Sequence, residues 1–338
     1  MDIFEHKEPF ALENGQSLPS IQVGYHTYGK LNAAKDNVVW VCHALTANSD
    51  PADWWKGLVG EGSIINPEKY FIVSANMLGS CYGSTGPVSI DPGTKEPYYS
   101  NFPQVTIRDM VKAHILLRKH LGIDTIYLLM GGSMGGYQAL EWCVMEKEVV
   151  KHLFLIATSP AESAWGIAVH TAQRLAIEAD ASWKEHRADA GANGLKAARG
   201  IGVITYRNYH ILQKTQQDED TNKLDGYKAS SYIQYQGEKL VKRFNAYSYW
   251  LLTKSMDSHN LARGRGGDMK MVLKNMQLPV LIIGIGSDIL CPLDEQRLMA
   301  DNLPHAKLVE IDSAYGHDGF IIETKLISLH LGKWLEQQ

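Results

Sequence analysis

Cysteine is scarce in this sequence, and its few copies are scattered. Cys42, Cys81, Cys143 and Cys291 form no C-x-x-C pair and no zinc-binding spacing. We therefore expect reduced, unpaired thiols in a cytoplasmic protein rather than a disulfide framework. The zinc motif H-E-x-x-H is also missing, and no cluster of His, Asp and Glu has ligand spacing, so we expect no bound metal.

An excess of charge of one sign and long apolar runs are missing as well. The 338 residues include 33 Lys and Arg against 37 Asp and Glu, a formal net charge of −4. This balance does not favour a nucleic acid or a membrane surface as a partner. No apolar run reaches the length of a membrane span, and the first ten residues, MDIFEHKEPF, are too polar for a signal peptide.

The sequence does contain a series of short apolar runs that are rich in β-branched residues and have the length of strands. Helical patterns lie between several of them, as in residues 107–122 and 294–303. Alternating buried strands and helices predict a mostly parallel sheet that is covered by helices on both faces. The predicted strands are residues 21–29, 37–45, 70–78, 125–131, 152–159, 279–287 and 306–313.

This alternation is interrupted between about residues 160 and 275, where amphipathic helical stretches replace the strands. The polar segment 213–226 within this region is expected to be an exposed loop. The strand pattern resumes near Pro279. We therefore predict an α/β core made of residues 1–160 and 275–338, with residues 161–274 inserted as a helical cap.

Four glycines surround a single serine where the strand predicted at 125–131 ends. Residues 131–135 read G-G-S-M-G, and a helical pattern follows. A G-x-S-x-G motif between a strand and a helix is the nucleophile elbow of α/β hydrolases. The tight turn leaves no room for side chains at positions 131 and 135, which explains the glycines there. Ser133 is the predicted nucleophile, and a glycine-rich loop without a catalytic role is the alternative.

A nucleophilic serine needs a base and an orienting acid, which follow it in the order Asp or Glu, then His, in this fold. Asp288 directly follows the strand predicted at 279–287, and His317 lies in a glycine-bordered loop after the strand at 306–313. Asp312 is a rival acid, but it precedes His317 too closely to come from a separate strand. His43 precedes Ser133, so we expect it to shape a loop rather than act as the base.

An oxyanion hole needs two backbone N–H donors near the nucleophile. One donor is expected from Met134, the residue after Ser133. The other is expected from the loop after an early strand, where we favour Leu45, at the end of the run 37–45.

Several longer stretches are distinctive in combination and together cover most of the chain. They include "VGYHTYGKLNAAKDNVVWVCHALTA", "ANMLGSCYGSTGP", "FPQVTIRDMV", "GGSMGGYQALEW", "YIQYQGEKLVKRFNAYSYWLLTKSMDSHNLARGRGG" and "YGHDGF". In these stretches the chain closely resembles the homoserine O-acyltransferase family, chiefly homoserine O-acetyltransferases, within the α/β-hydrolase superfamily. The resemblance implies the roles given above for Ser133, Asp288 and His317. It also implies that Arg199 holds the homoserine carboxylate, and that Tyr206 and Asp318 make the other acceptor contacts.

The activity that the resemblance implies is a ping-pong acyl transfer to homoserine in methionine biosynthesis. Acetyl-CoA, or another acyl-CoA, would be a co-substrate, and no permanently bound cofactor is expected. The resemblance also implies a homodimer formed through the cap helices. The aromatic stretch 230–252 could supply that surface, or it could belong to the core.

Several alternatives stay open at this level. The same triad could serve a carboxylesterase, the donor could be succinyl-CoA, or the acceptor could be serine; a catalytically inactive scaffold used for binding is a further option. Arg263 and Arg265 could contact the phosphates of coenzyme A or lie in a solvated turn. Three features depart from the family: Tyr137 replaces the usual Met, the loop 183–193 is short, and the composition of 213–226 is unusual.

Overall fold

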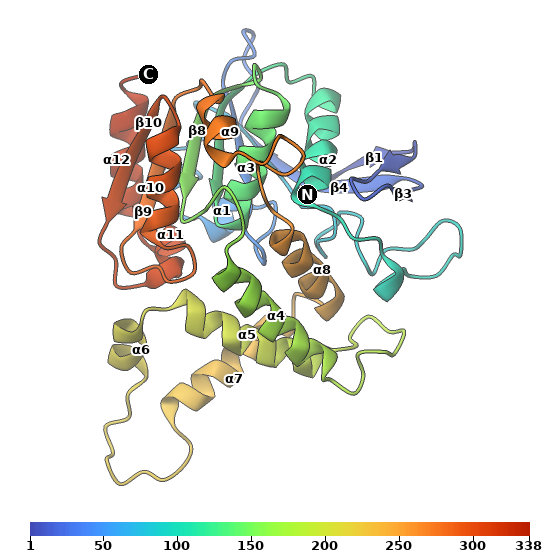
Figure 1. Cartoon of the computed structure of the whole chain (residues 1–338), viewed down its shortest axis with the longest axis vertical. Coiled ribbons are helices and arrows are strands. Elements are labelled where there is room, and N and C mark those ends of the chain that lie inside the picture. The colour runs from blue at the N-terminus through green and yellow to red at the C-terminus, as the bar shows by residue number, and fades with distance from the viewer.

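An eight-stranded sheet forms the centre of the protein, whose residues 1–338 are all described by a computed structural model (Figure 1). The strand order is β1-β4-β6-β5-β7-β8-β9-β10. All neighbouring pairs from β6 to β10 are parallel, and β1 and β4 add antiparallel pairs at one edge. The strands are β1 (Asp2–His6), β4 (Ile21–Tyr28), β5 (Val38–Cys42), β6 (Phe71–Ala75), β7 (Ile126–Gly132), β8 (Val150–Ile156), β9 (Val280–Ile285) and β10 (Ala306–Ile311).

The prediction of a mostly parallel sheet is confirmed, and each of the seven apolar runs overlaps a strand of the sheet, from β4 to β10. The edge strand β1 was not predicted. Its sequence, DIFEH, is mostly polar, and Phe4 is the only one of its residues that is buried. The short strands β2 (Phe10–Ala11) and β3 (Ser17–Leu18) pair with each other outside the main sheet.

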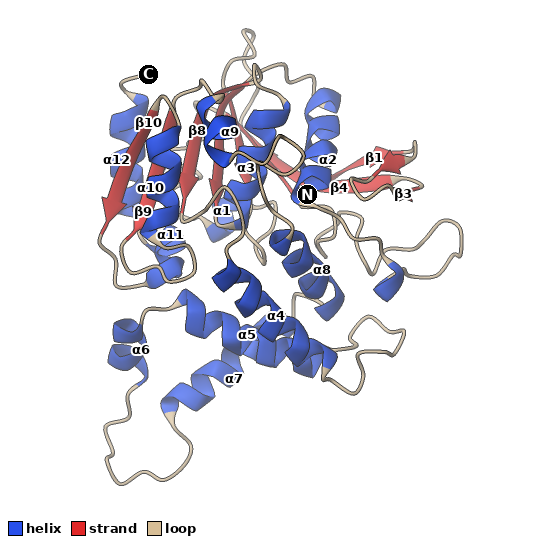
Figure 2. Cartoon of the chain, viewed as in Figure 1, coloured by secondary structure: helices blue, strands red, loops and turns tan.

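Helices cover both faces of the sheet, as the alternating pattern predicted (Figure 2). On β5, Trp40 belongs to one buried cluster and its neighbours Val39 and Val41 to another, so the two faces of the strand are both buried. Helices α2 (Ile107–His120), α3 (Met134–Met145), α9 (Met269–Lys274) and α10 (Leu293–Asn302) contribute to the Trp40 side. Helices α11 (Gly319–Ile322) and α12 (Thr324–Leu335) contribute to the other side, next to the short helix α1 (Pro51–Trp54).

Of the six helices between β8 and β9, all except α9 form a layer beside the core, below it in Figure 1. They are α4 (Ala164–Glu178), α5 (Ala192–Tyr206), α6 (Tyr209–Gln216), α7 (Lys228–Val241) and α8 (Ala246–Asp257). Residues 213–216, which were expected in an exposed loop, instead complete α6, and the loop begins after them.

The inserted helices share one hydrophobic cluster with the core. Leu195 of α5, Leu240 of α7 and Tyr249 of α8 belong to the same cluster as Trp40 of the sheet. In addition, the buried Ser255 hydroxyl of α8 donates a hydrogen bond to the Val105 carbonyl, at 2.7 Å. The inserted helices are therefore held against the core by packing. Figure 1 shows α5 on the side of the sheet where β9 and β10 end.

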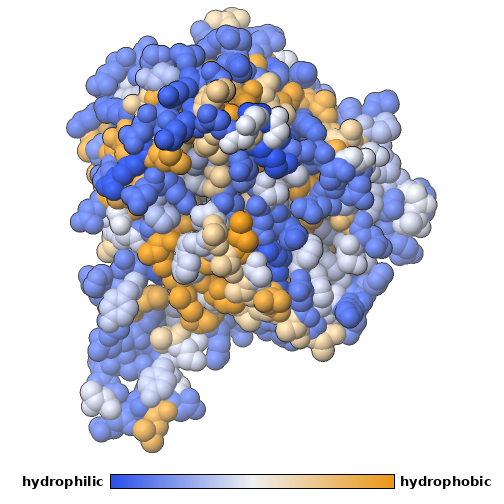
Figure 3. Space-filling model, viewed as in Figure 1, coloured by the Kyte–Doolittle hydropathy of each residue, from blue (hydrophilic) through white to orange (hydrophobic).

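The surface is mainly hydrophilic, but Figure 3 shows a hydrophobic area over the inserted helices. The exposed apolar side chains of α4 and α5 are Trp165, Ile167, Leu175 and Ile204. None of the helices combines the length and the apolar character that a membrane crossing requires.

Candidate active site

Ser133 occupies the sharp turn between β7 and α3. Its backbone has φ 54° and ψ −128°, a strained conformation for a residue with a side chain. A Cβ atom on Gly131 would lie 2.3 Å from the Gly135 carbonyl oxygen, and one on Gly135 would lie 2.2 Å from the Cys42 carbonyl oxygen. Both positions therefore require glycine, for the steric reason that the elbow motif suggested.

The two other glycines of the turn serve packing. A Cβ on Gly136 would lie 2.3 Å from the Thr158 hydroxyl oxygen, and one on Gly132 would lie 2.9 Å from the Phe320 ring. Thr158 in turn donates to the carbonyl of Ser133, at 2.8 Å. The small residues thus let the neighbouring segments approach the turn and brace it.

A continuous hydrogen-bonded chain runs from Ser133 to Asp288. His317 Nε2 lies 2.9 Å from Ser133 Oγ, and His317 Nδ1 lies 2.7 Å from Asp288 Oδ2. All three residues are buried. Asp312, the rival acid, is exposed, and the imidazole Nδ1 pairs with Asp288 instead. This arrangement is the geometry of a serine nucleophile, a histidine base and an orienting carboxylate.

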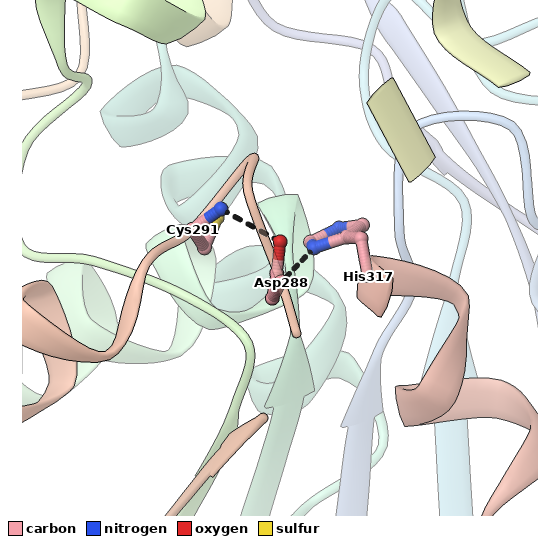
Figure 4. A group of neighbouring side chains, drawn as sticks. All are labelled: Asp288, Cys291 and His317. Atoms are coloured by element: carbon pink, nitrogen blue, oxygen red, sulfur yellow. Dashed lines mark hydrogen bonds and ion pairs between the residues drawn. The ribbon is translucent and has the colours of Figure 1, made fainter. Parts of the chain in front are cut away.

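Local hydrogen bonds hold the acid in place, as Figure 4 shows. Asp288 Oδ1 accepts the backbone N–H groups of Leu290 and Cys291, at 2.8 and 3.0 Å, which leaves Oδ2 for His317. Burial lowers the pKa of His317, but the charge and hydrogen bond of Asp288 outweigh burial, so the pKa is raised above its ordinary value. Asp288 therefore both orients the ring and stabilises its protonated form.

Cys291 brings a third potential ligand atom to this place. The ligand atoms of Asp288, Cys291 and His317 lie within 4.8 Å of one another, a spacing that a cation could bridge. Burial raises the pKa of the Cys291 thiol well above its usual range, so the sulfur stays protonated and is a poor ligand. The hydrogen bond between Asp288 Oδ2 and His317 Nδ1 accounts for the cluster as part of a triad.

Two backbone N–H groups near Ser133 have no acceptor within the chain. They belong to Leu45, in the loop after β5, and to Met134, the first residue of α3. Leu45 and Ser133 line the same cavity. The predicted oxyanion donors are thus free to bind an oxygen, although their role stays a prediction.

His43 supports the loop that carries Leu45. Its Nε2 accepts the N–H of Met77, at 3.1 Å, and its carbonyl accepts the Gln138 side chain, also at 3.1 Å. Burial lowers the pKa of His43 to about 4, so the ring is neutral. These contacts fit the interpretation of His43 as a residue that shapes the loop.

Residues from distant parts of the chain line one cavity of about 410 Å³ above Ser133. Arg199 and Tyr206 of α5 and Asp318 of the turn after β10 all border it, together with His317. The Arg199 guanidinium lies 5.5 Å from the centre of the Tyr206 ring, so both side chains occupy one face of α5. Arg199 forms no ion pair within the chain, and its charge is therefore available to an anionic ligand.

Three basic residues near this cavity were not singled out from the sequence. Lys239 and Arg243 also line it, and Arg207 forms an ion pair with Asp318, with 2.6 Å between Nε and Oδ2. No sequence pattern points to the last pair, because its members are separated by 111 positions.

Arg263 and Arg265 lie in the turn before α9 but do not face a free phosphate site. Arg263 pairs with Glu13 at 2.6 Å, and Arg265 pairs with the buried Glu141 at 2.7 Å. Arg108 contacts both of these carboxylates. Both arginines thus belong to an internal network of ion pairs, which does not favour a contact with the phosphates of coenzyme A and also differs from a merely solvated turn.

Tyr137, the departure within the elbow, also has an internal partner. Its hydroxyl donates to Glu162 Oε2, at 3.1 Å, and its ring stacks on His259, with 4.1 Å between ring centres. Burial raises the pKa of Glu162. Tyr137 thus satisfies a buried carboxyl group where a Met side chain could not donate.

Comparison with known proteins places this geometry in context. A family model described as the alpha/beta hydrolase fold matches residues 37–324. The chain is 46% identical to the homoserine O-acetyltransferase of Cyclobacterium marinum, with 95% of this chain and 91% of the relative covered. It is 45% identical to that of Chlorobaculum tepidum, covering 96% of this chain and 92% of the relative.

Solved structures show the same similarity. A homoserine O-acetyltransferase from Bacillus anthracis superposes with a TM-score of 0.91 at 26% identity, covering 99% of this chain and 96% of that one. The esterase E22 superposes with a TM-score of 0.89 at 23% identity, covering 99% of both chains, which supports the fold alone.

Proposed function

Because this chain belongs to the homoserine O-acetyltransferase family of the α/β-hydrolase superfamily, we propose that it acetylates the hydroxyl of homoserine through an acetyl-Ser133 intermediate. The observation that carries the proposal is a shared cavity. It holds the hydrogen-bonded Ser133 and His317 together with the unpaired guanidinium of Arg199. A nucleophile and a binding group for a carboxylate are thus present at one site.

In the first half of the proposed reaction, His317 Nε2 takes the proton of Ser133 while Oγ attacks the thioester carbonyl of acetyl-CoA. The backbone N–H groups of Leu45 and Met134 bind the resulting oxyanion. His317 then returns the proton to the departing sulfur. The C–S bond breaks, the thiol of coenzyme A leaves, and the acetyl ester of Ser133 remains. Acetyl-CoA is thus a co-substrate consumed in each turnover.

In the second half, homoserine enters with its carboxylate against Arg199, which can donate two parallel hydrogen bonds. Asp318 offers a negative charge to the ammonium group of homoserine. Tyr206 lines the same cavity as Arg199 and Asp318. His317 removes the proton of the homoserine hydroxyl, whose oxygen attacks the acetyl ester. Collapse of the tetrahedral intermediate transfers the acetyl group and returns the proton from His317 to Ser133.

The esterase, succinyltransferase and serine-acceptor alternatives are not favoured. Arg199 has no ion-pair partner and lines the same cavity as Asp318. An enzyme that only hydrolysed esters would have no evident use for this pair of opposite charges. The relatives from Cyclobacterium marinum and Chlorobaculum tepidum, which are 46% and 45% identical to this chain, are named homoserine O-acetyltransferases. The product would feed the synthesis of methionine, in the cytoplasm.

The test uses acetyl-CoA with and without homoserine, with thiol release followed by absorbance and the product identified by mass spectrometry. We expect O-acetylhomoserine and a thiol release that depends strongly on homoserine. Ser133→Ala should abolish transfer, whereas Ser231→Ala, which changes an exposed serine of α7, should not. Full activity of Ser133→Ala, or thiol release of equal rate without homoserine, would overturn the proposal.

We also propose a homodimer formed through the inserted helices. The exposed apolar side chains of Trp165 and Leu175 on α4 and Ile204 on α5 support it, because exposed apolar surface is typical of an interface. Within the aromatic stretch 230–252, Tyr235 is exposed but Tyr249 is buried in the core, so only its first half is available. One chain has a mass of 37.7 kDa, and light scattering after gel filtration should give twice this value.

A further inference from the structure

Asp318 does not stand alone at the acceptor end of the cavity. Its Oδ2 accepts the Nε–H of Arg207, at 2.6 Å, and both side chains are mostly shielded from solvent, with 27% of Arg207 and 22% of Asp318 exposed. Its other oxygen, Oδ1, accepts no hydrogen bond from the chain. The carboxylate is thus held on one side and available on the other.

The backbone around this ion pair is packed closely. A Cβ on Gly316 would lie 2.8 Å from the Tyr206 carbonyl oxygen and 2.9 Å from the Asn208 nitrogen, and Gly316 has a positive φ of 65°. The ring of Tyr206 lies 5.8 Å from the ring of His317. The end of α5 therefore packs closely against the turn that carries His317. The ion pair of Arg207 and Asp318 joins the same two segments at the edge of the cavity.

Arg199 of α5 and Arg207, which directly follows α5, differ in their ion pairs. Arg199 has no carboxylate partner, whereas the charge of Arg207 is compensated by Asp318. A zwitterionic acceptor would therefore find cationic side chains without a carboxylate partner, among them Arg199, and one free carboxylate oxygen, Oδ1 of Asp318. If Arg207 were unpaired, a further cation would compete for the carboxylate of the acceptor.

We propose that Arg207 is a positioning residue that holds the Asp318 carboxylate so that Oδ1 faces the ammonium group of an amino-acid acceptor. The inference rests on the proposed function, which assigns the ammonium to Asp318. Without Arg207, the Asp318 side chain can rotate towards the neighbouring imidazole of His317, whose protonated form it attracts. Oδ1 of Asp318 then no longer faces the ammonium group of the acceptor. The preference for acceptors that carry an α-amino group is expected to decrease.

The experiment compares two acceptors, homoserine and 4-hydroxybutanoate, which keeps the carboxylate and the hydroxyl but lacks the amino group. Arg207→Gln should lower kcat/KM for homoserine about 10-fold or more, mainly through KM, since a charge-assisted contact is disturbed. The loss for 4-hydroxybutanoate should be several times smaller. Arg207→Lys keeps the charge and should recover part of the loss for homoserine.

The matched control is Arg297→Gln, which breaks an ion pair of similar length with Glu310, at 2.7 Å, on the exposed surface of α10 and β10. This control variant should leave kcat/KM unchanged for both homoserine and 4-hydroxybutanoate. Equal losses for both acceptors in Arg207→Gln would overturn the inference, because they would indicate a merely structural role. No loss for either acceptor would overturn it as well.

Failure of the proposed function gives a different result. If the unaltered enzyme transfers no acetyl group to homoserine, the function is wrong, whatever the variants do. If it does transfer the group, the ratio of the two acceptors decides the inference alone. Should Arg207→Gln not fold, as judged by its thermal melting curve, Arg207→Lys is compared with Asp318→Asn, and both should reduce the preference for homoserine over 4-hydroxybutanoate.

Discussion

Replacing Asp288 by Asn should reverse the polarity of the hydrogen-bonded chain that ends at Ser133. Asp288 Oδ1 accepts two backbone N–H groups, those of Leu290 and Cys291. An Asn at this position keeps its oxygen there, because turning its NH₂ group towards two donors would leave both without an acceptor. The NH₂ group therefore points at His317 Nδ1, which must become an acceptor. The proton then sits on Nε2, and the imidazole can no longer take the proton of Ser133.

The expected loss follows from this change of tautomer. In triads of the same geometry, the wrong tautomer lowers kcat by about 10⁴-fold. Since each tenfold change corresponds to about 1.36 kcal/mol, the loss equals about 5.4 kcal/mol of transition-state stabilisation. The fold should persist, because Asp and Asn have nearly the same volume and both backbone hydrogen bonds remain. The KM for homoserine should change much less than kcat.

The assay is the transfer of acetyl from acetyl-CoA to homoserine in the steady state, with a rapid-mixing measurement of Ser133 acetylation. Asp294→Asn serves as the control, since this carboxylate of α10 is 91% exposed and lies outside the triad. A loss below about 10-fold in a folded Asp288→Asn protein would refute the tautomer argument. So would a rate of acetylation that equals that of the parent enzyme.

Three further predictions concern pH, backbone and ion pairs. Catalysis needs neutral His317, whose pKa is raised, so kcat/KM should fall as the pH drops through a value above the ordinary 6.5, seen in a pH–rate profile. Gly135→Ala should abolish transfer or folding, because its Cβ would lie 2.2 Å from a carbonyl oxygen at the end of β5, whereas Gly93→Ala, in an open loop, should be tolerated. Glu141→Gln should lower the free energy of unfolding by about 3 kcal/mol in a urea titration, because Arg265 loses a buried partner; an unchanged midpoint would contradict this.

The sequence predicted those parts of the molecule that depend on local patterns. Seven apolar runs became strands, and the glycine spacing around Ser133 reflects a collision that the backbone imposes. The order of Asp288 and His317 after late strands led to two residues that the fold brings into contact. The strands and the turn could be predicted because each depends on a single element. The contact of Asp288 with His317 could be predicted because this fold fixes the order in which the acid and the histidine follow the serine.

Contacts between distant and locally unremarkable residues could not be predicted. Arg207 looks like an ordinary charge at the end of a helix, and nothing nearby points to Asp318. Arg263 and Glu13 form an ion pair although they are 250 positions apart, so the sequence of the basic turn alone left a phosphate site open as an option. The edge strand β1 buries a single side chain and therefore shows too little periodicity to be recognised.

The single cavity above Ser133 imposes an order in time on the two substrates. Arg199, Asp318 and Ser133 line the same cavity of about 410 Å³. An acceptor that binds before Ser133 is acetylated therefore occupies the place that the thioester needs. Excess homoserine should therefore slow the enzyme by trapping its unacetylated form, and acetyl-CoA should relieve this inhibition. Competition of the two substrates for one cavity, rather than a conformational change, would then separate the two half-reactions in time.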